Sequence, residues 1–120
     1  MVDHLFFYWG LGLLLTHEMD AVRCREWKLF IILSGLKEPT AYRLFTALHI
    51  PLYGFLLQEL VQGPATVLVI GLDAFFVIHV LLHFLFSQHP AYGFTSWFSW
   101  LLIIGTGLCG LLDLAFYLSR

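Results

Sequence analysis

The chain has 120 residues, of which 60% are hydrophobic and only 12% are charged, and its formal net charge is -2. Soluble domains are on average about 45–50% apolar and about 25% charged, so this composition argues against a soluble globular protein and for a membrane protein. The near-neutral charge gives no sign of nucleic-acid binding, and the expected partner is the lipid bilayer. The length suits a single transmembrane domain, residues 1–120.

Four apolar stretches occur along the chain, at about residues 5–22, 41–61, 65–86 and 94–118. A membrane-spanning helix needs about 20 residues, so each stretch is long enough. The first stretch lacks a basic leader and an A-x-A cleavage site, which favours a retained span over a signal peptide. Because the later connections are short, neighbouring spans should be antiparallel. We therefore expect an all-α polytopic membrane protein with a four-helix transmembrane bundle.

The connection at residues 22–40 differs from the other two, which have no Lys or Arg. Its basic residues are Arg23, Arg25, Lys28 and Lys37. The positive-inside rule predicts that this loop is cytoplasmic and that both termini lie on the outer side of the cell membrane. Trp27 and residues 29–33 form an apolar patch too short to span. They predict a short interfacial helix with Trp27 at the membrane boundary; a shallow re-entrant turn is the alternative.

Two further patterns bear on packing. Cys24 and Cys109 fall in different segments at different expected depths, and a disulfide needs Cα atoms within about 7 Å, so two free thiols are expected. Thr106 and Gly110 form a small-xxx-small pair in the last stretch, which favours close helix approach. The pair would serve either packing within the bundle or a homo-oligomer interface. A partner protein in a membrane complex is a further possibility.

Ionisable residues lie within or at the ends of the apolar stretches. They are His17, Glu18, Asp20, His49, Asp73, His79, His83 and Asp113. Such groups are costly in a bilayer and usually face the bundle interior, pair with each other or mark a functional path. A rise of 1.5 Å per residue places the histidines and the first two acids in the cytoplasmic half of the bundle. Asp73 lies near mid-membrane and Asp113 towards the outer end.

A divalent metal site is one interpretation of this cluster, because imidazole and carboxylate are the ligands of zinc and non-haem iron. The candidate metal ligands are His17, His49, His79 and His83. The last two share a helix face because they are one turn apart. Glu18 or Asp20 would supply a carboxylate ligand or a catalytic general base. The expected cofactor is therefore Zn or Fe, and the sequence does not decide whether the protein is an enzyme.

The same residues fit other functions. In an accessory or scaffold subunit, the histidines would form a purely structural polar core. In a haem or pigment carrier, His49 and His79 would be axial ligands at matching depth. A proton or cation pathway through Asp73 and Asp113 is a further alternative and would need an oligomer. Asp113 is expected to bond to Tyr8 or His4 rather than to act as a catalyst, and the loop residue His89 is expected to be exposed.

Several segments carry a resemblance as a set. They are residues 16–21, with a His-Glu-x-Asp-Ala motif, then Glu26-Trp27, His49-Ile50-Pro51-Leu52, Asp73 and His79-x-x-Leu82-His83. Over most of its length the chain resembles small four-span bacterial membrane proteins that are themselves uncharacterised. The resemblance implies a bacterial integral membrane protein and supplies no activity. The chain lacks the several His-rich clusters of membrane fatty-acid hydroxylases, and alanine at position 21 breaks a zincin H-E-x-x-H.

Overall fold

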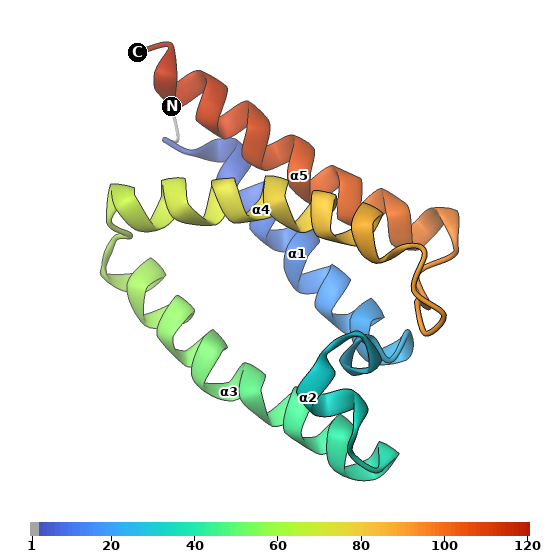
Figure 1. Cartoon of the computed structure of the whole chain (residues 1–120). Coiled ribbons are helices and arrows are strands. Elements are labelled where there is room, and N and C mark those ends of the chain that lie inside the picture. The colour runs from blue at the N-terminus through green and yellow to red at the C-terminus, as the bar shows by residue number, and fades with distance from the viewer. Residues whose placement is uncertain (1–2) are drawn as a thin grey trace.

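The computed structural model describes residues 3–120, which are helical with no strand among them (Figure 1). The long helices are α1 (Leu5–Arg23), α3 (Glu38–Gln62), α4 (Thr66–Phe86) and α5 (Trp97–Leu118). Two short elements, η1 (Glu26–Leu29) and α2 (Ile31–Ser34), lie between α1 and α3. The expected all-α fold is confirmed, and the four long helices occupy the four apolar stretches.

Local sequence explains where the helices begin and end. Pro39 stands in the first turn of α3, where its missing N–H leaves no bond unmade. Gly63 ends α3 with a φ of 89°, a backbone conformation that glycine adopts without strain. At the start of α5, the Ser96 hydroxyl accepts a hydrogen bond from the Ser99 N–H at 3.1 Å.

Three helices, α3, α4 and α5, are long and apolar enough to cross a membrane. α1 is not among them, because the polar residues near its end, including His17, Glu18 and Asp20, lower its hydropathy. Large apolar side chains on the long helices are exposed, for example Leu48 at 61% and Leu85 at 72%. An apolar surface of this extent fits a membrane protein.

The tightest packing joins α5 to α1 and α4. A Cβ atom on Gly110 would lie 2.6 Å from the Asp73 carbonyl oxygen, so glycine lets α4 and α5 approach closely there. Thr106 is fully buried, and its hydroxyl donates to the Leu102 carbonyl. The small residues of α5 therefore serve packing within the chain.

α3 lies apart from this three-helix unit and reaches it mainly through η1 and α2 (Figure 1). Its buried residues are only Ala41 and Phe45, both near its start. The expected four-helix bundle is therefore not confirmed: three helices pack closely, and α3 meets them mainly near its start and through the contact of His49 with Glu18. The physical reason is that α3 has few inward-facing side chains with which to bury against its neighbours.

The segment between α1 and α3 also differs from expectation. Trp27 is only 4% exposed and packs on Phe45 at a ring-centroid distance of 5.6 Å. The indole therefore joins the start of α3 to the end of α1, and the expected interfacial helix with Trp27 at the membrane boundary is not confirmed. The most exposed apolar residues of this segment are Ile31 and Ile32, at 93% and 84% exposed.

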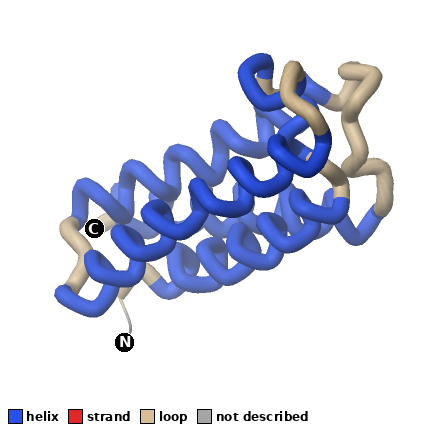
Figure 2. Tube along the Cα trace, turned by 90° about the horizontal axis from the view of Figure 1, so that it is seen from below, coloured by secondary structure: helices blue, strands red, loops and turns tan. Residues whose placement is uncertain are grey.

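The chain termini and the connecting segments lie at the two ends of the long helices. Figure 1 and Figure 2 together show the start of α1 and the end of α5 at the same end of the molecule, with α2 and the loop before α5 at the other. We call these the terminal end and the η1 end. Both cysteines are free, as predicted, because Cys24 follows α1 at the η1 end whereas Cys109 lies inside α5.

Candidate metal centre

Three histidines meet at the η1 end of the packed helices. His17 comes from α1, and His79 and His83 come from α4; all three are buried. The ring of His17 lies 4.7 Å from that of His79 and 4.9 Å from that of His83, between centroids. The Nε2 atoms of His79 and His83 are 3.2 Å apart. The i, i+4 spacing on one helix face explains how α4 presents both rings together.

Glu26 is the fourth member of the cluster. Its Oε1 lies 3.8 Å from His83 Nε2, and one ligand atom from each of the four residues lies within 4.8 Å of all the others. Arg25, with a left-handed φ of 54°, turns the chain so that η1 brings Glu26 back over the helices. Sequence reasoning missed Glu26 because it lies outside the apolar stretches. The sequence feature that could have identified Glu26 is an acid placed among the basic residues of this loop.

The cluster contains ring nitrogens without hydrogen-bond partners. Among residues 3–120, both nitrogens of His17 and Nδ1 of His79 are buried and unpartnered. An unsatisfied buried polar group costs about 1–3 kcal/mol. Two imidazole nitrogens on a tetrahedral ion at about 2.0–2.1 Å lie about 3.3 Å apart, close to the 3.2 Å between the His79 and His83 nitrogens. The donor set and its spacing therefore suit a metal ion.

The loop before α5 closes one side of the cluster. The Tyr92 hydroxyl lies 2.9 Å from His83 Nδ1, and the buried ring of Phe94 lies 4.8 Å from that of His83. Gly93 lets the loop lie flat on the end of α1, because a Cβ there would lie 2.7 Å from the Cys24 carbonyl oxygen. Tyr92 thus orients His83 through the ring nitrogen that faces away from the cluster.

Burial changes the acidity of the loop residues at this centre. Burial, and then the charge of Glu18, raises the pKa of the Glu26 carboxyl to about 8. Burial, and then the charge of Glu26, raises the pKa of the Tyr92 hydroxyl. Near neutral pH and without metal, Glu26 therefore holds its proton, which metal binding would displace.

His49 does not join the other three histidines. Its Nε2 lies 2.8 Å from Glu18 Oε2, and its Nδ1 donates to the Phe45 carbonyl at 2.7 Å. Since a carbonyl can only accept, Nδ1 carries a hydrogen, and one more proton lies between Nε2 and the Glu18 carboxyl. The structure thus assigns His49 to a pair with Glu18, and Glu26 stands where His49 was expected.

Asp20, the other candidate acid, faces a different neighbour. Its Oδ1 accepts from Arg23 Nε at 2.9 Å, and its Oδ2 accepts from the Ser99 hydroxyl at 2.5 Å. These bonds join the end of α1 to the start of α5. Asp20 is therefore placed to hold helices together, whereas Glu18 is the acid on the side of the histidines.

An apolar cavity of about 410 Å³ adjoins the cluster. Its polar lining comes from Glu18, Glu26, His49, His79 and His83. Its apolar lining is Leu29, Phe30, Leu33, Phe45, Leu48, Phe75, Leu82 and Phe86. The cavity therefore gives a hydrophobic molecule a route to one side of the cluster and brings it beside the His49–Glu18 pair.

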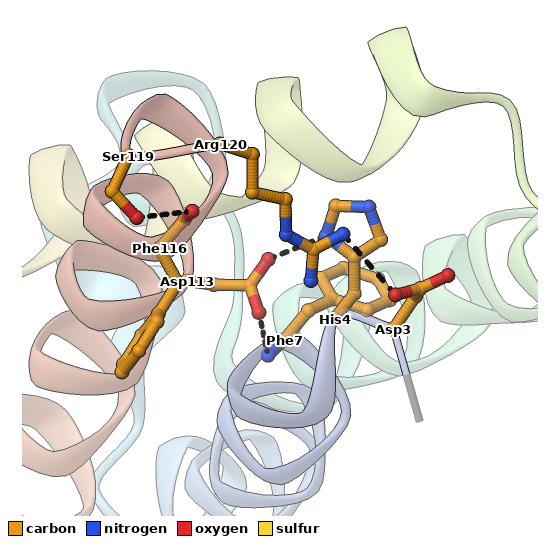
Figure 3. A network of polar contacts seen from close by, with 7 residues as sticks. All are labelled: Asp3, His4, Phe7, Asp113, Phe116, Ser119 and Arg120. Carbon is orange, nitrogen blue, oxygen red and sulfur yellow. Dashed lines mark hydrogen bonds and ion pairs between the residues drawn. The ribbon is translucent and has the colours of Figure 1, made fainter. Parts of the chain in front are cut away.

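The remaining sequence candidates lie elsewhere. Asp73 and Asp113 are both buried, towards the terminal end. Asp113 pairs with His4 at 2.6 Å and accepts a bond from the Phe7 N–H at 3.2 Å, as drawn in Figure 3. The prediction that Asp113 bonds to His4 or Tyr8 is confirmed for His4. His89 is exposed, as expected.

Comparisons with known proteins give one match. No curated protein matches the chain, and no solved structure does. The family described as a family of unknown function (DUF6713) matches residues 3–120. Since the match covers nearly the whole sequence, this chain belongs to the DUF6713 family, whose function is unknown.

Proposed function

We propose that this chain is a multi-pass membrane protein that binds one divalent metal ion through His17, His79, His83 and Glu26, with zinc or iron as the metal. The observation that carries the proposal is His17, which is fully buried between two other imidazoles with neither of its ring nitrogens bonded among the described residues. A metal ion would bond to a ring nitrogen whose burial without a partner otherwise costs folding free energy. Within a bilayer no water is at hand to take its place.

The proposal includes four spans, with α1 as the fourth beside α3, α4 and α5. α1 packs along α5, and its polar side chains His17 and Asp20 are buried inside the protein. Inward-facing ionisable groups are what a membrane helix tolerates. The basic loop between α1 and α3 would then lie in the cytoplasm with both termini outside. The metal centre would therefore stand at the cytoplasmic end of the spans.

The cavity supports a role for the centre in chemistry on a lipophilic molecule. His79, His83 and Glu26 line the cavity while His17 stands behind them, so a ligand would reach the metal from one side only. A metal ion polarises a bound oxygen and lowers its pKa. The Glu18–His49 pair lines the same cavity and holds a proton between its two side chains, so it could exchange protons with a ligand there.

Two alternative functions receive less support from the geometry. A haem needs an open slot between its axial ligands, whereas the cluster rings contact each other edge to face. His49, the other proposed axial ligand, has both nitrogens engaged. A purely structural polar core would leave the buried nitrogens of His17 without partners.

Elemental analysis of the detergent-purified full chain, prepared without chelators and combined with an absorbance spectrum, tests the proposal. We expect zinc or iron in the wild-type protein, and the loss of one equivalent of it in His79→Ala. The matched control is His89→Ala, which removes an exposed imidazole and should keep the metal. Wild-type protein that carries no metal and whose thermal stability ignores added zinc and iron would overturn the proposal. A haem absorbance band would favour the carrier function instead.

A further inference from the structure

A second group of possible metal ligands lies towards the terminal end, away from the histidine cluster. It consists of His4, just before α1, Asp73 in α4 and Asp113 in α5. One ligand atom from each lies within 4.8 Å of the other two. His4 has a left-handed backbone with a φ of 58°, which is uncommon for a residue other than glycine. The start of α1 is thus turned so that the imidazole meets two acids from other helices.

Close helix packing explains why the two acids face each other. Gly110 lies one turn before Asp113 on α5, and a Cβ at Gly110 would lie 2.6 Å from the Asp73 carbonyl oxygen. No larger residue would allow the two backbones this approach. The contact brings the carboxyl groups of Asp73 and Asp113 to the same buried point, where Asp73 is 1% exposed and Asp113 is 3% exposed.

Among the described residues, only one of the two acids in this cluster has hydrogen-bond partners. Asp113 accepts from the Phe7 N–H at 3.2 Å and pairs with His4 Nδ1 at 2.6 Å (Figure 3). Neither oxygen of Asp73 has a hydrogen-bond partner among residues 3–120. A buried carboxylate needs a partner, and two buried carboxylates together repel each other. A cation bound between them, or a proton shared by them, would relieve both costs.

The nearest cation drawn in Figure 3 is engaged at the rim. The guanidinium of Arg120 pairs with Asp3 at 3.1 Å, and both side chains are more than half exposed. The pairing of Arg120 with Asp3 therefore leaves Asp73 without a cationic side chain as partner among residues 3–120. A divalent cation would balance the two carboxylates, with His4 neutral as the third ligand.

We propose that His4, Asp73 and Asp113 form a second divalent-cation site, which fastens the start of α1 to α4 and α5. One imidazole nitrogen with two carboxylate oxygens suits Zn²⁺ or Mn²⁺, since the hard ions Mg²⁺ and Ca²⁺ prefer oxygen alone. His4 would exchange its hydrogen bond with Asp113 for a bond to the ion. The competing outcome is a single proton shared by the two carboxyl groups.

The test uses the full chain in detergent, stripped with a chelator, and titrates Zn²⁺ alone by calorimetry. The His79→Ala variant serves as the parent, because it removes a ligand of the histidine cluster and separates this site from the proposed function. We expect this parent to bind one Zn²⁺. Adding Asp73→Asn should weaken binding by more than about tenfold, the scale seen for losing even an outer-shell partner. Adding Asp3→Asn, at the exposed rim, should leave the affinity unchanged.

Asp73→Asn is the preferred variant because the Asp73 oxygens make no hydrogen bond that the change would break. Thermal stability gives a second readout. Zn²⁺ should raise the melting temperature of the parent and not that of the parent with Asp73→Asn. A parent that binds no zinc, or a doubly substituted chain that binds it equally well, would overturn the proposal. If Asp73→Asn stabilises the metal-free protein and zinc affects neither chain, the carboxyl groups share a proton and the site is not a cation site.

Discussion

The Nε2 atoms of His79 and His83 lie 3.2 Å apart on one face of α4, inside the protein. One helical turn is enough to bring these two rings together. What distinguishes the site is the third imidazole, His17, which α1 inserts against both rings. Glu26 then approaches from a loop rather than from a helix.

His17 and His49 should differ in their effect on metal content, although the sequence makes them equal candidates. His17→Ala removes a ring from the centre of the cluster and should remove one equivalent of bound metal. His49→Ala breaks only the pair with Glu18 and should leave the metal in place. Elemental analysis of the two purified variants measures both. Metal retained in the first and lost in the second would show that the donor set is assigned wrongly.

Tyr92→Phe should weaken metal binding while leaving the protein folded. The hydroxyl lies 2.9 Å from the Nδ1 of His83 and holds the ring with its other nitrogen towards the cluster. Loss of such an outer-shell partner typically costs about 10–100-fold in affinity. Competition with a chromophoric chelator would measure the metal affinity of the variant and of the wild type. Tyr117→Phe, at the terminal end, is the control, and equal affinities in the two variants would argue against the orienting role.

Glu26→Gln should change how stability depends on pH in the metal-free protein. The folded-state pKa of Glu26 is about 8, above its ordinary value of 4.5, so the folded state holds the proton more tightly. The stability contributed by the protonated acid is fully present below about pH 4.5 and is lost as the pH rises to about 8. Gln cannot ionise, so the variant should resist this loss.

Denaturation of the chelator-treated protein at about pH 5 and about pH 8 checks the Glu26 prediction. The free energies of unfolding of variant and wild type should be similar at the lower pH, with the variant more stable at the higher pH. Glu59→Gln, which changes an acid on α3 outside the histidine cluster, should follow the wild-type curve. Parallel curves for wild type and Glu26→Gln would contradict the prediction.

Two glycine substitutions should have opposite effects. Gly110→Ala places a methyl group 2.6 Å from the Asp73 carbonyl oxygen, and overpacking of this kind costs about 1–3 kcal/mol. Gly71→Ala meets open space on α4 and should stabilise the helix by about 0.5–1 kcal/mol. The unfolding free energies in detergent measure both. Equal effects would mean that α4 and α5 do not approach as closely as described.

The proposed topology predicts which introduced cysteines a membrane-impermeant thiol reagent reaches. In a chain whose two native cysteines are replaced by Ser, Lys37→Cys should react only after the cell is opened. Gln62→Cys, at the opposite end of α3, should react in intact cells. Both side chains are exposed in the fold. Reaction of Lys37→Cys in intact cells would reverse the orientation.

Local sequence patterns were sufficient to predict part of the candidate site. The spacing of His79 and His83 requires only a helix for the two rings to share a face, so counting along the chain was sufficient. Depth limited the expected partners of Asp113 to Tyr8 or His4, and His4 is the partner in the structure. Depth also suggested that His49 would meet His79, but depth does not give the rotation or tilt of a helix. The rotation of α3 turns His49 to Glu18.

The sequence by itself determined that the protein is helical and apolar, because long runs of apolar residues admit few other structures in a membrane. Only the tertiary structure decided which polar groups meet. Trp27 and Glu26 lie in a connection without periodicity, and their places depend on a left-handed turn at Arg25 and on packing against α1, α3 and α4. These contacts join residues distant along the chain, and their energies arise only when the helices are packed together.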